Sequence, residues 1–111
     1  MNIKIQGSST GKTHELIKEF LKNAASSFLV VPTEVHKRYI ELLITRDFEL
    51  DYEFLEDSVL TFEEFKDMSY KREINFFMDD VNLMPVSLKS LLEIEKVNEC
   101  HISCTVNVDM E

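Results

Sequence analysis

The chain has 111 residues, of which 44% are hydrophobic and 10% aromatic, so it has the size and apolar content of one small globular domain. Its 21 acidic and 12 basic residues give a formal net charge of −9, and no basic run is long enough to follow a nucleic-acid backbone. This charge excludes strong autonomous nucleic-acid binding. Because no segment has the length of a membrane span or the pattern of a signal peptide, we expect a cytoplasmic protein without membrane contact.

The first half of the chain alternates between short apolar runs and helical periodicity, a pattern typical of α/β domains. Residues 2–6 are predicted to form a strand, and a helix follows because apolar residues recur on one face at positions 16, 17, 20, 21 and 24. A second strand is predicted at 27–31, and a second helix runs from Val35 to near Asp47. These elements complete one βαβ step.

The second half is predicted to supply the remaining strands of a mainly parallel sheet of about five. Residues 48–57 are acidic and aromatic without a clear period, so we expect an irregular surface connection there. A short strand at 59–62, a short helix at 63–69 and a strand at 74–78 follow. Pro85 suits the first turn of a helix that carries Glu95 and Lys96 on its outer side, and residues 101–106 form the last strand.

Both glycines of the chain lie between the first strand and the first helix. Glycine permits positive φ and close backbone approach, so successive N–H groups can surround a phosphate at the positive end of the following helix. A glycine-bearing turn with a chance Gly-Lys-Thr is the alternative interpretation. The candidate phosphate-binding residues are Gly7, Ser8, Ser9, Thr10, Gly11, Lys12 and Thr13.

This segment resembles the Walker A motif of P-loop NTPases, G-x-x-x-x-G-K-[ST], except that Gln6 occupies the position of the first glycine. The resemblance implies a three-layer αβα P-loop NTPase-like domain that binds ATP with Mg²⁺. It also implies that Lys12 contacts the β- and γ-phosphates during catalysis and that the Thr13 hydroxyl is a ligand of Mg²⁺.

The strand predicted at 74–78 ends in two carboxylates, Asp79 and Asp80. Ligands of open parallel sheets collect at the carboxyl ends of the strands, where the glycine-bearing loop also lies. The pair resembles the Walker B motif, which implies that Asp79 holds the Mg²⁺ shell through water and that Asp80 is the catalytic carboxylate that orients and deprotonates the attacking water. Most hydrolytic relatives carry Glu at the second position, so the shorter Asp favours slow hydrolysis. An ordinary strand exit is the alternative for an isolated acidic pair.

Other polar residues have two interpretations each. At the end of the last strand, Thr105 and Asn107 are either phosphate sensors or a polar strand end that faces solvent. Thr33 follows Pro32, and we favour a helix N-cap there over a nucleic-acid contact. Three arginines are either surface charges or groups that act in trans across an oligomer interface. They are Arg38, Arg46 and Arg72.

Taken together, the chain resembles the front half of a RecA-like or additional-strand-type ATPase core, and its compact, acidic form is similar to products of bacteriophages and mobile elements. We expect a small ATP-binding protein that is a slow Mg²⁺-dependent ATPase, with its first strand at a sheet edge open to a protein partner or to self-association. The alternative is a non-catalytic interaction module that binds and modulates a larger host or phage protein. A small kinase is disfavoured because no arginine-rich lid is present. GTP remains open because neither a guanine-reading nor an adenine-reading motif is present.

Overall fold

The computed structural model describes residues 1–6, 11–50 and 52–107 of the chain. The predicted phosphate-binding residues Gly7, Ser8, Ser9 and Thr10 therefore lie outside the described residues. In the part that is described, no helix is both long enough and apolar enough to cross a membrane. The elements in chain order are β1 (Asn2–Gln6), α1 (Lys12–Lys22), η1 (Ala24–Ser26), β2 (Ser27–Val31), α2 (Glu34–Phe48), α3 (Tyr52–Ser58), β3 (Val59–Thr61), α4 (Phe62–Asp67), β4 (Asn75–Met78), η2 (Val81–Leu83), α5 (Leu88–Asn98) and β5 (His101–Asn107).

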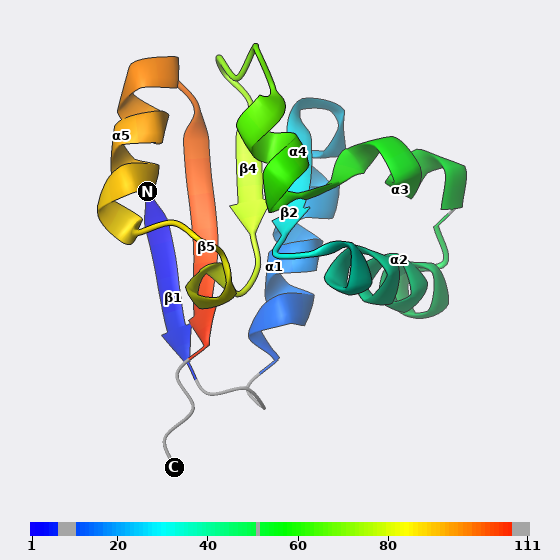
Figure 1. Ribbon diagram of the computed structural model, residues 1–111. Coiled ribbons are helices and arrows are strands. Elements are labelled where there is room, and N and C mark those ends of the chain that lie inside the picture. The colour runs from blue at the N-terminus through cyan, green and yellow to red at the C-terminus, as the bar shows by residue number, and fades with distance from the viewer. Residues whose placement is uncertain (7–10, 51, 108–111) are drawn as a thin grey trace.

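The strands form one sheet in the order β1-β5-β4-β2-β3, and every neighbouring pair is parallel. This confirms the predicted α/β fold with a mainly parallel sheet of about five strands. Because all strands point the same way, their carboxyl ends lie at one edge of the sheet. Figure 1 shows α1 beginning at that edge, near the arrowheads of β1 and β5. Of the described strands, β1 and β3 are outermost, so β1 lies at an edge as expected.

Helices cover both faces of the sheet because successive strand residues are apolar on both sides. In β2, Leu29 and Val31 belong to the core shared with α1, α2 and α3, whereas Val30 belongs to the core shared with α4 and α5. In β4, Phe77 joins the first core and Phe76 joins the second. The sheet is therefore the middle of three layers, in an αβα arrangement.

The prediction of an irregular connection over residues 48–57 is wrong, because α3 forms at Tyr52–Ser58. Leu55 is fully buried in the core beneath α1 and α2, whereas Glu53 and Glu56 are exposed. Such a short helix has no readable period in the sequence, and its stability comes from tertiary packing such as that of Leu55.

Hydroxyl side chains determine where two of the longer helices begin. Thr33 accepts a 3.3 Å bond from the backbone N–H of His36 at the start of α2, which confirms the predicted N-cap. Ser87 likewise accepts a 3.1 Å bond from the N–H of Ser90 and caps α5. The cap at Ser87 places the start of α5 after Pro85, so the prediction of Pro85 in the first helical turn is wrong.

The prediction that Glu95 lies on the outer side of α5 is wrong, because its side chain reaches the sheet. Its Oε2 atom accepts a 2.7 Å hydrogen bond from the backbone N–H of Ile102 in β5. Lys96, in contrast, lies in the last turn of α5, where a cation complements the helix dipole. Glu95 therefore joins α5 to the sheet.

Candidate phosphate and metal site

At the carboxyl edge of the sheet, α1 begins with an N-cap that has no side chain. Gly11 occupies this position in the left-handed conformation, with φ 75° and ψ 14°, which favours glycine. By contrast, hydroxyl side chains accept bonds from backbone N–H groups at the starts of α2, α4 and α5. Since Gly11 caps none of the first-turn N–H groups of α1, these groups and the positive end of the helix dipole favour an anion here.

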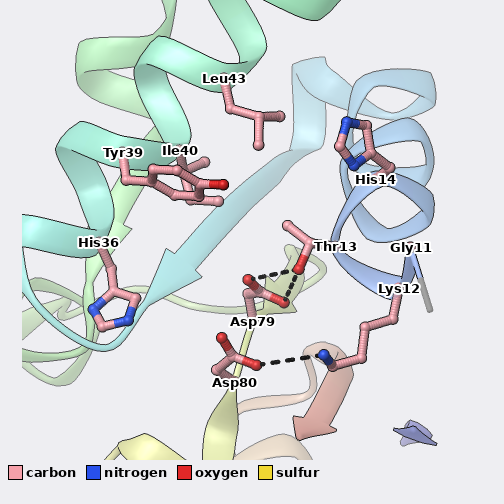
Figure 2. A pocket seen from close by; sticks show the side chains of 10 residues that line it. All are labelled: Gly11, Lys12, Thr13, His14, His36, Tyr39, Ile40, Leu43, Asp79 and Asp80. Carbon is pink, nitrogen blue, oxygen red and sulfur yellow. Dashed lines mark hydrogen bonds and ion pairs between the residues drawn. The ribbon is translucent and has the colours of Figure 1, made fainter. Parts of the chain in front are cut away.

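The Thr13 hydroxyl and the Asp79 carboxylate meet at this edge, although 66 positions separate them in the sequence. Thr13 Oγ1 lies 3.2 Å from each carboxylate oxygen of Asp79 (Figure 2). Asp79 is only 5% exposed, and its backbone N–H donates a 2.9 Å bond to the carbonyl of Val30 in β2. The two residues predicted as metal ligands are therefore adjacent and held by the sheet.

Thr105 of β5 orients both acidic residues. Its hydroxyl donates a 2.7 Å bond to Asp79 Oδ1 and accepts a 2.9 Å bond from the backbone N–H of Asp80. In this arrangement the Thr105 hydroxyl donates its only proton to Asp79 and has none left for a phosphate. Thr105 is also fully buried, so the alternative of a strand end that faces solvent is wrong at this position. Asn107, the second candidate, is partly exposed, and its backbone N–H donates a 2.8 Å bond to the side chain of Asn82.

Lys12 and Asp80 form the charged centre of the site. The Lys12 side chain is 4% exposed, and its Nζ atom lies 3.9 Å from Asp80 Oδ1, which is too long for a hydrogen bond. Asp80 has φ 53° and ψ 54°, a left-handed conformation that aspartate tolerates. Its Oδ1 atom is buried and receives no hydrogen bond from any described residue. Within the part of the chain that the structure describes, the pair therefore brings a buried ammonium close to a carboxylate oxygen that has no hydrogen-bond partner.

The environment of Asp79 disfavours its negative charge. Burial raises the pKa of Asp79 above its ordinary value, and the neighbouring Asp80 carboxylate raises it further. Hydrogen bonds from Thr105 and Thr13 and the charge of Lys12 act in the opposite direction. A cation placed beside both carboxylates would relieve this repulsion.

One pocket of about 320 Å³ connects these groups to α2 (Figure 2). Its polar side consists of the predicted site residues at the start of α1 and after β4. No sequence motif marks the residues of the other side, although α2 follows β2, whose carboxyl end lies at the same edge. The position of α2 directly after β2 is the sequence signal that could have indicated that α2 lines the pocket. The α2 side is lined by His36, Tyr39, Ile40 and Leu43.

His14 also lines the pocket and links α1 to α2. Its Nε2 atom lies 3.1 Å from Asp47 Oδ2, and Arg46 Nε lies 2.7 Å from Asp47 Oδ1. Hydrogen bonds from Arg46 and from His14 lower the pKa of Asp47 to about 2. The Asp47 carboxylate is therefore charged at neutral pH and attracts His14 toward α2.

The arginines considered for a role in trans lie away from this pocket. Arg46 pairs with Asp47, and Arg72 Nε lies 3.0 Å from Glu99 Oε2, with both members of the latter pair largely exposed. Arg38 is exposed on α2. Their positions agree with the interpretation of these residues as surface charges.

Comparisons of the chain with protein-family models, with curated proteins and with solved structures found no match. The functional assignment therefore depends on the geometry of the site itself. The described residues that carry it are Gly11, Lys12, Thr13, Asp79, Asp80 and Thr105.

Proposed function

We propose that the chain binds ATP with Mg²⁺ in this pocket and hydrolyses it slowly, as a small P-loop ATPase. The observation that carries the proposal is the contact between Thr13 and Asp79, at 3.2 Å to both carboxylate oxygens. A hydroxyl that follows Gly-Lys at a helix start and a carboxylate at a strand end are the groups that hold Mg²⁺ in P-loop nucleotide sites. Lys12 and Asp80 add a cation and a base beside them.

The phosphates of the nucleotide would lie at the start of α1. The left-handed Gly11 and the first-turn N–H groups of α1 favour an anion there, and the buried Lys12 ammonium supplies the positive charge. Lys12 has only Asp80 as an ionic partner among the described residues, at 3.9 Å, so its hydrogen-bonding capacity suits phosphate oxygens. The segment 7–10, which the resemblance to Walker A includes, would complete the phosphate loop.

The residues beside this position fit Mg²⁺. The Thr13 hydroxyl and the Asp79 carboxylate lie 3.2 Å apart, and both are oxygen groups of the kind that Mg²⁺ prefers, so together they would hold the ion and its bound water. No group of three or more His, Cys, Asp or Glu side chains suited to a metal occurs in residues 1–6, 11–50 and 52–107. Phosphate oxygens and water would therefore complete the coordination, as is usual for Mg²⁺. The ion, when bound, supplies charge that neutralises the phosphates and both aspartates.

Asp80 is the residue that we propose activates water. The water oxygen forms a bond to the terminal phosphorus while the bond between that phosphorus and the bridging oxygen breaks, and ADP leaves with the electron pair. Asp80 accepts the proton of the water and passes it to the released phosphate. Asp80 Oδ1 lies 3.9 Å from Lys12 Nζ, so the proposed base and the phosphate-binding cation would act side by side.

The strand order supports an ATPase of the additional-strand type. β5 lies between β1, which precedes the glycine-bearing loop, and β4, which precedes the acidic pair. Thr105 in this intervening strand binds Asp79 and the backbone of Asp80. The inserted strand therefore has a direct role in positioning the proposed catalytic carboxylates.

Thermal unfolding with and without ATP and Mg²⁺ tests the proposal. A ligand that binds only the folded state raises Tm, and we expect this rise to need both nucleotide and metal. Thr13→Val should remove the part of the rise that depends on Mg²⁺, whereas Thr45→Val, an exposed control on α2, should keep it. Phosphate release should occur in the wild type and be lost in Asp80→Asn, with nucleotide binding retained. If neither nucleotide nor metal changes Tm, the proposal is wrong.

The second candidate is a non-catalytic interaction module that uses the open edge of the sheet. β1 is an outer strand of the described sheet, and Ile3 and Ile5 are exposed on it. Such an edge can accept a strand from a partner. The two candidates differ in one observable, because only the ATPase loses phosphate release in Asp80→Asn.

A further inference from the structure

α2 carries an exposed apolar stripe on the side that faces away from the sheet. Val35 is 76% exposed, Tyr39 62% and Leu42 68%, and Arg46 continues the row. The intervals of four, three and four residues bring all four side chains onto one stripe of the helix, as in the seam of a coiled coil. The opposite side of α2 is apolar as well and is buried in the core. A helix that is apolar on two sides needs a second partner surface.

The stripe includes a groove of about 310 Å³. Tyr39, Leu42, Leu43 and Arg46 line it. Tyrosine and arginine are enriched among the residues that dominate binding energy at protein interfaces. The groove is therefore suited to a side chain from another helix.

The charge of this surface differs from that of the rest of the chain. The protein has a net charge of −9, which opposes contact between two copies over most of its surface. On α2, Glu41 is buried at 2% exposure, so the exposed carboxylates lie only at the two ends, at Glu34 and Asp47. Arg38 and Arg46 are exposed between them. The middle of α2 is thus a surface on which two acidic copies can meet without carboxylates facing one another.

We infer that the occupant of this stripe is α2 of a second copy of the chain, packed antiparallel across a twofold axis. In an antiparallel seam with these intervals, Tyr39 lies opposite the partner's Leu42, and Val35 lies opposite the partner's Arg46. Glu34 then lies near the partner's Arg46, which still has Nη1 donors because its bonds to Asp47 use Nε and Nη2. The apolar centre is therefore self-complementary, and at each end Arg46 would lie between Asp47 of its own chain and the partner's Glu34. Because Tyr39 and Leu43 line both this groove and the site pocket, the contact would lie beside that pocket, but the inference does not require nucleotide binding.

The edge of β1 is less suited to pairing two copies. Lys4 projects from this strand and pairs with Glu15 and Glu19 of α1, at 3.2 and 3.5 Å. A strand added at this edge would have to lie beside that charged group, and charged side chains protect strand edges from such pairing. Self-association through α2 avoids this cost.

The interface is small, so the dimer should be weak. α2 has 15 residues, which corresponds to a length of about 22 Å. One helix pair of this length buries less surface than a standard stable interface. We therefore expect a dimer whose population rises with protein concentration.

Sedimentation velocity of the full chain over a concentration series is the first test. We expect the wild type to shift from monomer to dimer, and Leu42→Glu to weaken association by at least about tenfold. Val97→Glu is the matched control, because Val97 is an exposed apolar residue on α5 and is 80% exposed. A monomer at every concentration overturns the inference. A dimer that Leu42→Glu leaves unchanged also overturns it, because the contact then lies elsewhere, for example at β1.

A charge exchange tests the antiparallel register. Arg46→Glu and Glu34→Arg should each weaken the dimer, and the double variant Glu34→Arg/Arg46→Glu should restore it. If the double variant is weaker than both single variants, the register is wrong. Loss of the internal bond between Arg46 and Asp47 cannot produce such a restoration.

Disulfide trapping gives a second measure of the register. When equal amounts of Tyr39→Cys and Leu42→Cys chains are mixed, we expect the mixed disulfide to exceed twice the yield of each homodimer, the ratio that random pairing gives. The native thiols do not interfere, since Cys100 and Cys104 are buried and burial raises the pKa of Cys104 to about 11. A mixed product at or below twice the yield of each homodimer contradicts the antiparallel pairing.

Discussion

The Thr105 hydroxyl donates a 2.7 Å hydrogen bond to Asp79 and so connects β5 to the carboxylate that follows β4. The same oxygen accepts a bond from the backbone N–H of Asp80. One buried hydroxyl in the neighbouring strand therefore orients both members of the acidic pair. The proposed metal and water positions depend on this single residue.

Thr105→Val should test that dependence, because valine keeps the shape of threonine and removes both hydrogen bonds. The buried N–H of Asp80 and the Asp79 carboxylate each lose a partner, so we expect the free energy of unfolding to fall by about 1–3 kcal/mol. Urea denaturation measures the change. Thr45→Val, at an exposed position on α2, should change the free energy by less than about 0.5 kcal/mol. Equal effects of the two substitutions would show that Thr105 does not carry this role.

Asp79→Asn should stabilise the ligand-free protein at pH 7. Because the pKa of Asp79 is raised in the folded state, the folded state binds the proton more tightly than the unfolded state. Stability is therefore greatest below the ordinary pKa and falls as the pH rises through the folded pKa. Asparagine removes this loss while its Oδ1 atom still accepts the bond from Thr105.

Thermal unfolding of the wild type and Asp79→Asn at pH 7 and at pH 4 checks the sign. We expect the variant to have the higher Tm at pH 7 and the difference to shrink at pH 4. With Mg²⁺ and ATP the order should reverse, because the variant lacks the metal-binding carboxylate. A variant less stable than the wild type at pH 7 without ligand contradicts this assignment of the pKa.

Gly11→Ala should cost stability through backbone strain alone. Apart from its chain neighbours, no described residue has an atom within 4 Å of a Cβ placed on Gly11, but the φ of 75° is unfavourable for alanine. We expect the free energy of unfolding to fall by about 1–2 kcal/mol. Gly11→Asn should cost less, because asparagine tolerates the left-handed conformation. Equal stability of the alanine variant and the wild type would contradict the left-handed cap.

The sequence allowed the sheet and one side of the site to be predicted, because both depend on local patterns. Alternating apolar runs indicated the strands, and Lys12, Thr13, Asp79 and Asp80 were identified from their positions at a helix start and a strand end. The contact between Thr13 and Asp79 follows only if these ends lie at one edge of a parallel sheet, which the strand order confirms. Local sequence patterns of this kind therefore predict which residues lie at the carboxyl edge of the sheet.

What could not be predicted depends on tertiary contacts. α3 is only seven residues long, too short to display a period, and its Leu55 is buried by tertiary packing. The α2 side of the pocket has no motif of its own. The role of Thr105 depends on β5 lying beside β4, and sequence order does not specify which strands are neighbours. The start of α5 was misplaced because the proline signal at Pro85 was given more weight than the cap at Ser87.

The most direct test of nucleotide binding is calorimetric titration of the protein with a non-hydrolysable ATP analogue and Mg²⁺. Lys12→Ala should be titrated beside the wild type, with Lys66→Ala as a control because Lys66 lies exposed on α4 and outside the pocket. We expect the wild type and Lys66→Ala to bind alike and Lys12→Ala to bind at least about tenfold more weakly. Binding that Lys12→Ala leaves unchanged, or a wild type that does not bind, would contradict the proposed phosphate site.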